Sequence, residues 1–153
     1  MRRTTVFDLL VPFVIIGIST YALLRFSYDS IPPLGYVVPV PLAALAVIEL
    51  VIARRIRAAV RHDPDAKPMT AIAIARCVAL GKASSVVGAA VAGAAAALLL
   101  RVAPDARMVR QAAADTRVAS LLLAAAVLMV VAGLVLERSG IDPNRDKHHS
   151  STT

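Results

Sequence analysis

The sequence has little cysteine and few aromatic residues, and the shortage of cysteine excludes two kinds of site. Cys77 is the only cysteine among 153 residues, so we expect no intrachain disulfide and no cysteine-rich metal site. Tryptophan is absent, and aromatic residues make up 4% of the chain. Phosphate-binding loops, zinc motifs and paired catalytic carboxylates are missing as well. The sequence therefore predicts no enzyme, no metal site and no cofactor.

Acidic residues are outnumbered, with 10 Asp and Glu against 17 Lys and Arg, which gives a formal net charge of +7. Such an excess is common in nucleic-acid-binding proteins. Here the basic residues stand beside long apolar runs, so we exclude nucleic acid as a partner. In a membrane protein, the same charge sets orientation and attracts anionic lipid headgroups.

Hydrophobic residues dominate the chain, at 58% of the sequence with a mean hydropathy of +0.72. A membrane-spanning helix needs about 20 predominantly apolar residues. Runs of this kind lie at about 6–24, 36–53, 80–101 and 118–136. The sequence therefore predicts an all-α fold, a four-helix transmembrane bundle over residues 1–138. The polar residues 139–153 are predicted to form a disordered cytoplasmic tail.

Proline and capping residues suggest where three of these helices begin. We expect Tyr36–Pro39 to be extended, because two prolines follow each other closely at the start of the second helix. Thr70 is a suitable N-cap for a third helix over about 71 to 101. A loop is expected after it, ending at Asp115 or Thr116 as the cap of the fourth helix.

The third apolar run has one face almost without side chains. Small residues recur there in two rows at steps of four, which suits close packing of two helices in a membrane. The predicted helix-packing residues are Gly81, Ser84, Ser85, Gly88, Ala89 and Gly93. We expect this helix to be central and the second helix to pack against it.

Glu49 is an acidic residue within the second apolar run. It stands five residues before Arg54, and hence roughly 7 Å inside the membrane boundary. An ionisable group at such a depth is costly unless it is paired, hydrated or protonated. We expect Glu49 to face Lys82, either as an ion pair that fixes helix order or as a proton- or cation-linked site. Three further residues are predicted to join this polar intramembrane cluster: Asp8, Arg76 and Glu137.

A basic segment follows Glu49 and carries four arginines, Arg54, Arg55, Arg57 and Arg61. An apolar stripe at steps of four runs through the same segment, so we expect an amphipathic extension along the headgroups. Binding of anionic lipid is the simpler interpretation, and a specific partner or substrate headgroup is the alternative.

Two serines beside Lys82 raise the question of a nucleophile activated by a lysine base. Ser84 and Ser85 belong to the small-residue face, however, and no oxyanion-stabilising pattern accompanies them. We therefore interpret both serines as packing residues.

The distribution of basic residues predicts orientation. Lys and Arg number 12 over the N-terminus, the central connection and the tail, against 5 in the other two connections. The excess predicts a multi-pass protein of the plasma (inner) membrane with both termini in the cytoplasm.

An ordered set of short motifs runs through the chain: Asp8-Leu9-Leu10, Pro32-Pro33, Pro39-Val40-Pro41, Glu49, Ala75-Arg76, Leu80-Gly81-Lys82-Ala83-Ser84, Gly88, Gly93 and Leu136-Glu137. In this order they resemble the actinobacterial membrane family catalogued as domain of unknown function 3180 (DUF3180), over about residues 3–138. The family pattern often continues after Leu-Glu into Cys-Arg, whereas this chain has Arg138-Ser139-Gly140. The resemblance implies a four-span inner-membrane protein without an assigned activity.

These observations favour a small, noncatalytic integral membrane protein with a helix-association, accessory or scaffold role. Its partners would be membrane lipids, further copies of itself or another membrane protein. The alternative is a small proton- or cation-coupled transporter that uses Glu49.

Overall fold

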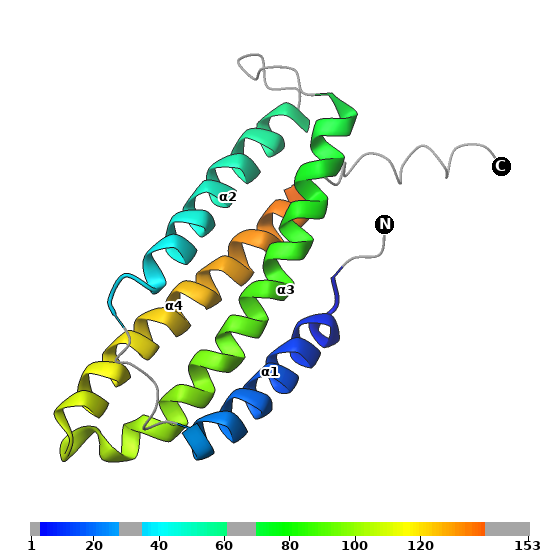
Figure 1. The fold of residues 1–153 in the computed structure, drawn as a ribbon. Helices are drawn as coiled ribbons and strands as arrows, with labels where there is room; N and C mark the ends of the chain where they lie inside the picture. Colours follow the sequence, from blue (N-terminus) through cyan, green and yellow to red (C-terminus); the bar gives the residue numbers. More distant parts are fainter. Residues whose placement is uncertain (1–3, 28–34, 61–69, 140–153) are drawn as a thin grey trace.

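The computed structural model describes residues 4–27, 35–60 and 70–139, which are mostly helical (Figure 1). The elements in chain order are α1 (Val6–Ser27), α2 (Pro39–Val60), α3 (Ala71–Val102), the 3-10 helix η2 (Ala103–Arg107) and α4 (Arg110–Ser139). The predicted all-α class is confirmed. The predicted disordered tail lies outside the described residues, except Ser139, which ends α4.

Local hydrogen bonds define the starts of α1 and α3. The Thr5 N–H donates to the Asp8 carboxylate at 2.8 Å, which is one half of a capping box. Thr70 caps α3, as the sequence predicts, because its hydroxyl accepts from the Ala73 N–H at 3.4 Å.

Two predicted boundaries are wrong. Tyr36–Val38 forms a turn and not an extended strand, with the Val38 N–H donating to the Gly35 carbonyl at 3.2 Å. The turn places Pro39 at the first helical position, where its missing N–H costs nothing. The predicted loop before the fourth helix is largely helical, because α4 begins at Arg110. Asp115 therefore lies inside α4 and is not its cap.

The four α-helices form an open row in the contact order α1–α3–α4–α2 (Figure 1). The central pair, α3 and α4, packs antiparallel. Along the described residues, α1 packs mainly against α3, whereas α2 packs against α4 and touches α3 at only a few points. The sequence neighbours α1 and α2 are thus separated by α3 and α4.

The central contact depends on glycines in both helices. A Cβ added at Gly133 of α4 would stand 2.6 Å from the Gly81 carbonyl oxygen and 2.9 Å from the Ser85 nitrogen. A second close approach joins α1 to α3, where a Cβ at Gly93 would overlap the Phe13 carbonyl. The small-residue face of α3 is therefore covered by α4 and α1, and the prediction that the second helix covers it is wrong.

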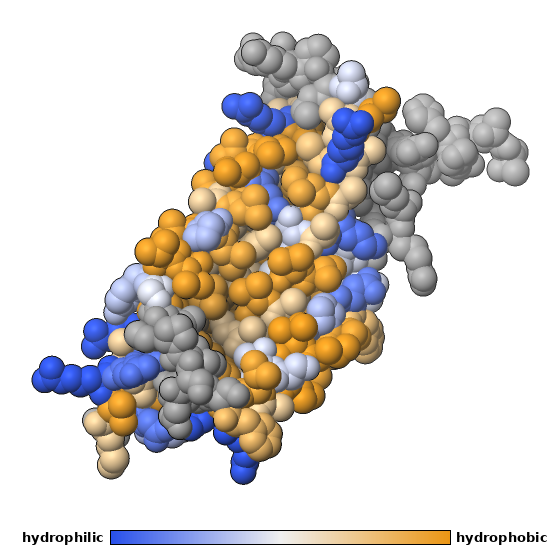
Figure 2. Space-filling view, viewed as in Figure 1, coloured by the Kyte–Doolittle hydropathy of each residue, from blue (hydrophilic) through white to orange (hydrophobic). Residues whose placement is uncertain are grey.

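Three helices are long and apolar enough to cross a membrane, over Val6–Phe26, Ile72–Ala106 and Arg110–Ser139. Large apolar side chains cover the outside of the row, including Val6 and Phe7, which are 74% and 73% exposed. Figure 2 shows apolar residues over the middle of the molecule and hydrophilic residues mainly near its two ends. This distribution is typical of a membrane protein.

Candidate functional site

Glu49 lies on the face of α2 that packs against α4. The buried residues of this face are Ala46, Glu49, Ala53 and Ile56, at alternating steps of three and four. On one side of Glu49, Ala46 belongs to a cluster with Met129 and Ala132 of α4. On the other side, Ala53 and Ile56 pack in a cluster with Leu136. Glu49 is therefore enclosed between two apolar contacts.

The Glu49 side chain is fully buried, and neither carboxyl oxygen has a hydrogen-bond partner. Ser84 of α3 lies close enough for its hydroxyl to interact with this carboxyl. That hydroxyl instead donates to the Leu80 carbonyl within its own helix, at 3.0 Å. The Ser84 hydroxyl thus lies beside Glu49 but donates its hydrogen bond within α3.

The close α3–α4 contact explains how a side chain of α2 reaches α3. Gly81 and Ser85 meet Gly133 backbone to backbone, so no bulky side chain separates the two helices there. Ser85 is fully buried, and its hydroxyl donates to the Lys82 carbonyl at 2.9 Å. Glu49 therefore faces a surface that consists largely of backbone and small side chains.

The structure does not bring the predicted polar cluster together. Lys82 and Arg76 are exposed, and the Glu49 carboxyl accepts no hydrogen bond from either. Asp8 is exposed and caps α1. Glu137 is buried and accepts the Thr4 N–H at 2.7 Å and the Thr4 hydroxyl, which ties the start of α1 to the end of α4.

The six predicted packing residues are all buried, but they serve different neighbours. Gly81 and Ser85 face α4 around Gly133, and Gly88 lies against Val130 of α4. Gly93 faces α1 instead. Ser84 and Ala89 complete the buried set.

The arginines of the basic segment point away from the row. Arg54, Arg55 and Arg57 are exposed, whereas Arg61 lies outside the described residues. Ile56, in the apolar stripe of this segment, is fully buried in a cluster that includes residues of α3 and α4. The stripe is thus covered by protein, which corrects the expectation that it lies along the headgroups.

Sequence reasoning missed Gly133 and two apolar grooves. Gly133 is the one glycine inside the fourth apolar run, which was the available signal. A groove of about 550 Å³ lies between α2 and α4, lined by Tyr36, Pro39, Val40, Ala43, Leu121, Ala124, Ala125 and Leu128. Another of about 500 Å³ lies between α1 and α3. A groove depends on how two helices are placed relative to each other, and the residue pattern of one helix does not specify this.

The chemistry of the Glu49 site follows from its isolation. An ionised carboxylate without a partner is very costly in an apolar interior. A carboxyl that carries a proton, or one that holds a cation, avoids that cost. The site can therefore store a proton or bind a cation, and the Ser84 hydroxyl lies beside it.

Comparison with known proteins places the chain in a family. The sequence model of a family described as protein of unknown function (DUF3180) matches residues 9–143. The chain belongs to this family. The match covers most of the DUF3180 chain, including α2 through α4 and the Glu49 site. No curated protein and no solved structure matches the DUF3180 chain.

Proposed function

We propose that this DUF3180 protein is a noncatalytic integral membrane protein that acts by associating with other membrane helices, as an accessory or scaffold. The observation that carries the proposal is the open row. A closed bundle directs the packing faces of its helices inward, whereas this row leaves α1 and α2 as uncovered flanks.

The α2–α4 groove is the part of the surface best suited to another helix. Its lining includes Ala43, Ala124 and Ala125, small residues that let a second backbone approach closely. Lipid tails are as apolar as this surface, so covering it with lipid yields no hydrophobic free energy. A lining of small residues instead favours close packing with another helix.

Association is tested by crosslinking in membranes and by sizing after gentle detergent extraction. We expect a defined oligomer or a defined complex for the wild type. Ala124→Leu fills the groove and is expected to reduce that species severalfold. Val127→Leu, at an exposed position of α4 outside the groove, is the matched control and should leave it intact. A strictly monomeric wild type without a partner would contradict the proposal.

We also propose four membrane passes, with both termini in the cytoplasm of a plasma-membrane protein. α2 runs parallel to α4 and follows it from near Leu121 to Leu136, so a membrane that contains α4 also surrounds α2. The Thr4–Glu137 contact supports a common side for the start of α1 and the end of α4. A reporter fused after Thr153 should be active only in a cytoplasmic assay, and a periplasmic signal would contradict this orientation.

The exposed arginines of α2 support anionic lipids as partners at the cytoplasmic end. Arg54, Arg55 and Arg57 project from one end of the row, next to the apolar surface. Such basic clusters attract anionic headgroups. Enrichment of anionic lipid with the purified protein should decrease as salt is raised, and salt-insensitive enrichment would argue for a specific ligand instead.

Proton- or cation-coupled transport through Glu49 is the second candidate. The observation that favours it is the fully buried carboxyl without a hydrogen-bond partner. An ionisable residue inside a membrane protein is by default a candidate for a proton or ion pathway. The contact between α2 and α3 is slight, so a movement of α2 would expose Glu49 without breaking the central α3–α4 pair.

This candidate is tested in proteoliposomes that contain a pH-sensitive dye, with an imposed pH gradient and Na⁺ or K⁺ as the counter-ion. Transport through Glu49 predicts protein-dependent proton flux that Glu49→Gln abolishes while assembly is retained. Glu137→Gln is the control, because Glu137 is also buried but already bonded to Thr4. Absence of wild-type flux, or flux unchanged in Glu49→Gln, would reject the candidate.

A further inference from the structure

The groove between α1 and α3 is open to the outside of the row and is almost entirely apolar. Gly17 of α1 faces Gly93 of α3, where an added Cβ would stand 3.3 Å from the Gly93 carbonyl oxygen. The two glycines let the helices meet closely and leave a furrow of about 500 Å³ beside the contact. The lining consists of Phe13, Val14, Gly17, Ile18, Tyr21, Gly93, Ala96, Ala97 and Leu100.

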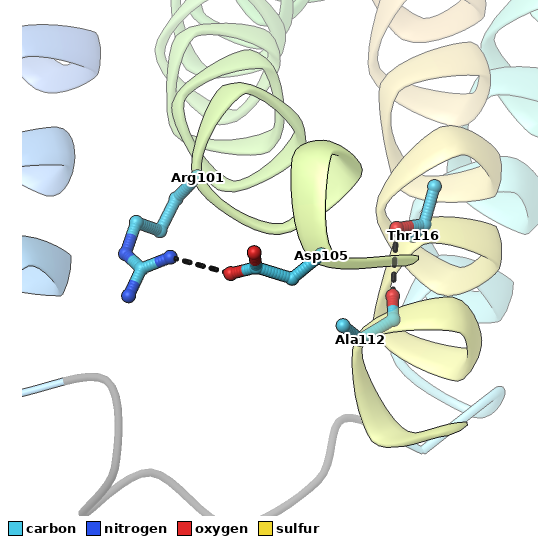
Figure 3. Close-up of polar contacts among 4 residues, drawn as sticks. All are labelled: Arg101, Asp105, Ala112 and Thr116. Atoms are coloured by element: carbon cyan, nitrogen blue, oxygen red, sulfur yellow. Dashed lines mark hydrogen bonds and ion pairs between the residues drawn. The ribbon is translucent and has the colours of Figure 1, made fainter. Parts of the chain in front are cut away.

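Two arginines continue the lining of this groove toward one end of the molecule. Arg25 follows Tyr21 by four residues on α1, and Arg101 follows Ala97 by four residues on α3. Positions four apart in a helix lie on the same face, so both arginines lie one turn beyond the lining residues. Figure 3 shows Arg101 extending from α3 on the side of α1, with its guanidinium 3.2 Å from the Asp105 carboxylate.

The charge at this end of the row is predominantly positive. Arg25, Arg110 and Arg117 are exposed there, and Arg101 is partly exposed. The acidic residues of the same end, among those described, are Asp105 and Asp115. A ligand at the end of the groove therefore meets a field that favours an anion.

The apolar groove and the arginines together select one kind of occupant. In a membrane, placing a lipid chain in an apolar groove yields no hydrophobic free energy. The chain does make dispersion contacts with lining residues that would otherwise face a gap. Selectivity must then come from the polar end, where arginine binds phosphate through paired hydrogen bonds. A second copy docked in parallel would bring its own Arg25 and Arg101 to the same level, and like charges disfavour it.

We propose that this groove is a binding site for a phospholipid with an anionic headgroup. One acyl chain lies along the groove between α1 and α3, and Arg25 and Arg101 hold the headgroup phosphate. This site is at the opposite end of the helices from Arg54–Arg57 and is independent of the proposed helix association.

The test uses the full-length protein in nanodiscs with a phosphatidylglycerol that carries a photoreactive group in its acyl chain. We expect crosslinks in peptides that contain residues 13–21 and 96–100. Arg25→Gln with Arg101→Gln should reduce them by about tenfold, the effect of losing charge-assisted hydrogen bonds. Arg54→Gln with Arg55→Gln is the matched control and should leave these crosslinks unchanged. Photoreactive phosphatidylcholine should label the groove weakly in all variants.

A further variant separates binding from folding. Ala96→Leu fills the groove without touching the Arg101–Asp105 pair, and it should lower the labelling of the groove while the thermal unfolding midpoint stays close to that of the wild type. The proposal is overturned if labelling is equal for both lipids or if it persists in the Arg25/Arg101 variant.

Discussion

Glu49 is a buried carboxylic acid on the α2 face that packs against α4, between apolar clusters that contain Met129 and Leu136. The position of an acid inside an apolar run is evident from the sequence, and so is its energetic cost. Its surroundings are not, because they depend on residues of α4, such as Met129, which lies 80 residues further along the chain. Lys82 of α3 is exposed and donates no hydrogen bond to the Glu49 carboxyl.

The energetic cost of Glu49 yields a prediction at the scale of one residue. A buried polar group without a partner costs about 1–3 kcal/mol. Methionine has a similar volume and adapts to irregular apolar space. Glu49→Met should therefore raise the free energy of unfolding, measured as a higher thermal midpoint of the detergent-purified protein.

Glu137→Met is the comparison for this experiment, since Glu137 is buried but accepts two hydrogen bonds from Thr4. Its thermal midpoint should fall. If the thermal midpoint of Glu49→Met falls as far as that of Glu137→Met, Glu49 has a partner in the membrane. The description of an isolated carboxyl would then be incorrect.

The helices themselves were largely predictable, because long apolar runs in a membrane must satisfy their backbone hydrogen bonds internally. Their ends were less predictable. α4 begins at Arg110, well before the apolar run, because polar residues in a helix can continue its hydrogen-bond pattern into water. Thr116 illustrates this, since its hydroxyl donates to the Ala112 carbonyl at 2.7 Å inside the helix and does not cap it (Figure 3).

The α3–α4 contact leads to a prediction at the scale of paired elements. Gly133→Ala would place a methyl group against backbone atoms of Gly81 and Ser85, which can yield only if the helices separate. We expect a loss of about 1–3 kcal/mol in stability, the usual cost of overpacking. Thermal unfolding of the purified protein measures it.

Gly35→Ala is the matched control for this substitution. A Cβ at Gly35 would approach nothing closer than the Val37 nitrogen at 4.0 Å, so its midpoint should stay near that of the wild type. Equal stability of Gly133→Ala and the wild type would mean that α3 and α4 do not meet at this glycine.

At the scale of the whole molecule, the order of helices is the feature that the sequence did not reveal. The small-residue face of α3 indicates that some helix packs there, but several helices offer small residues of their own. The contact of Gly133 with Gly81 and that of Phe13 with Gly93 assign the face to α4 and α1, which displaces α2 to the far side of α4. Which helix packs on this face depends on the fit between backbones that are distant in sequence. The pattern of a single helix does not reveal that fit.

The open row also relates the two proposed interaction surfaces to each other. Helix association is proposed at the α2–α4 groove, and lipid binding at the α1–α3 groove. Both grooves exist because each flanking helix packs against a single central helix along most of its length. A closed bundle of the same helices would bury much of both surfaces.

Cysteine crosslinking in intact membranes tests the open row most directly, in a Cys77→Ser background with intramolecular products identified by mass. Ala46→Cys with Ala132→Cys should join α2 to α4, and Leu24→Cys with Leu98→Cys should join α1 to α3. Cysteine pairs between α1 and α2, such as Ile15→Cys with Val47→Cys, should give no intramolecular product. Efficient α1–α2 crosslinking, at the level of the other two pairs, would contradict the open row and favour a closed bundle.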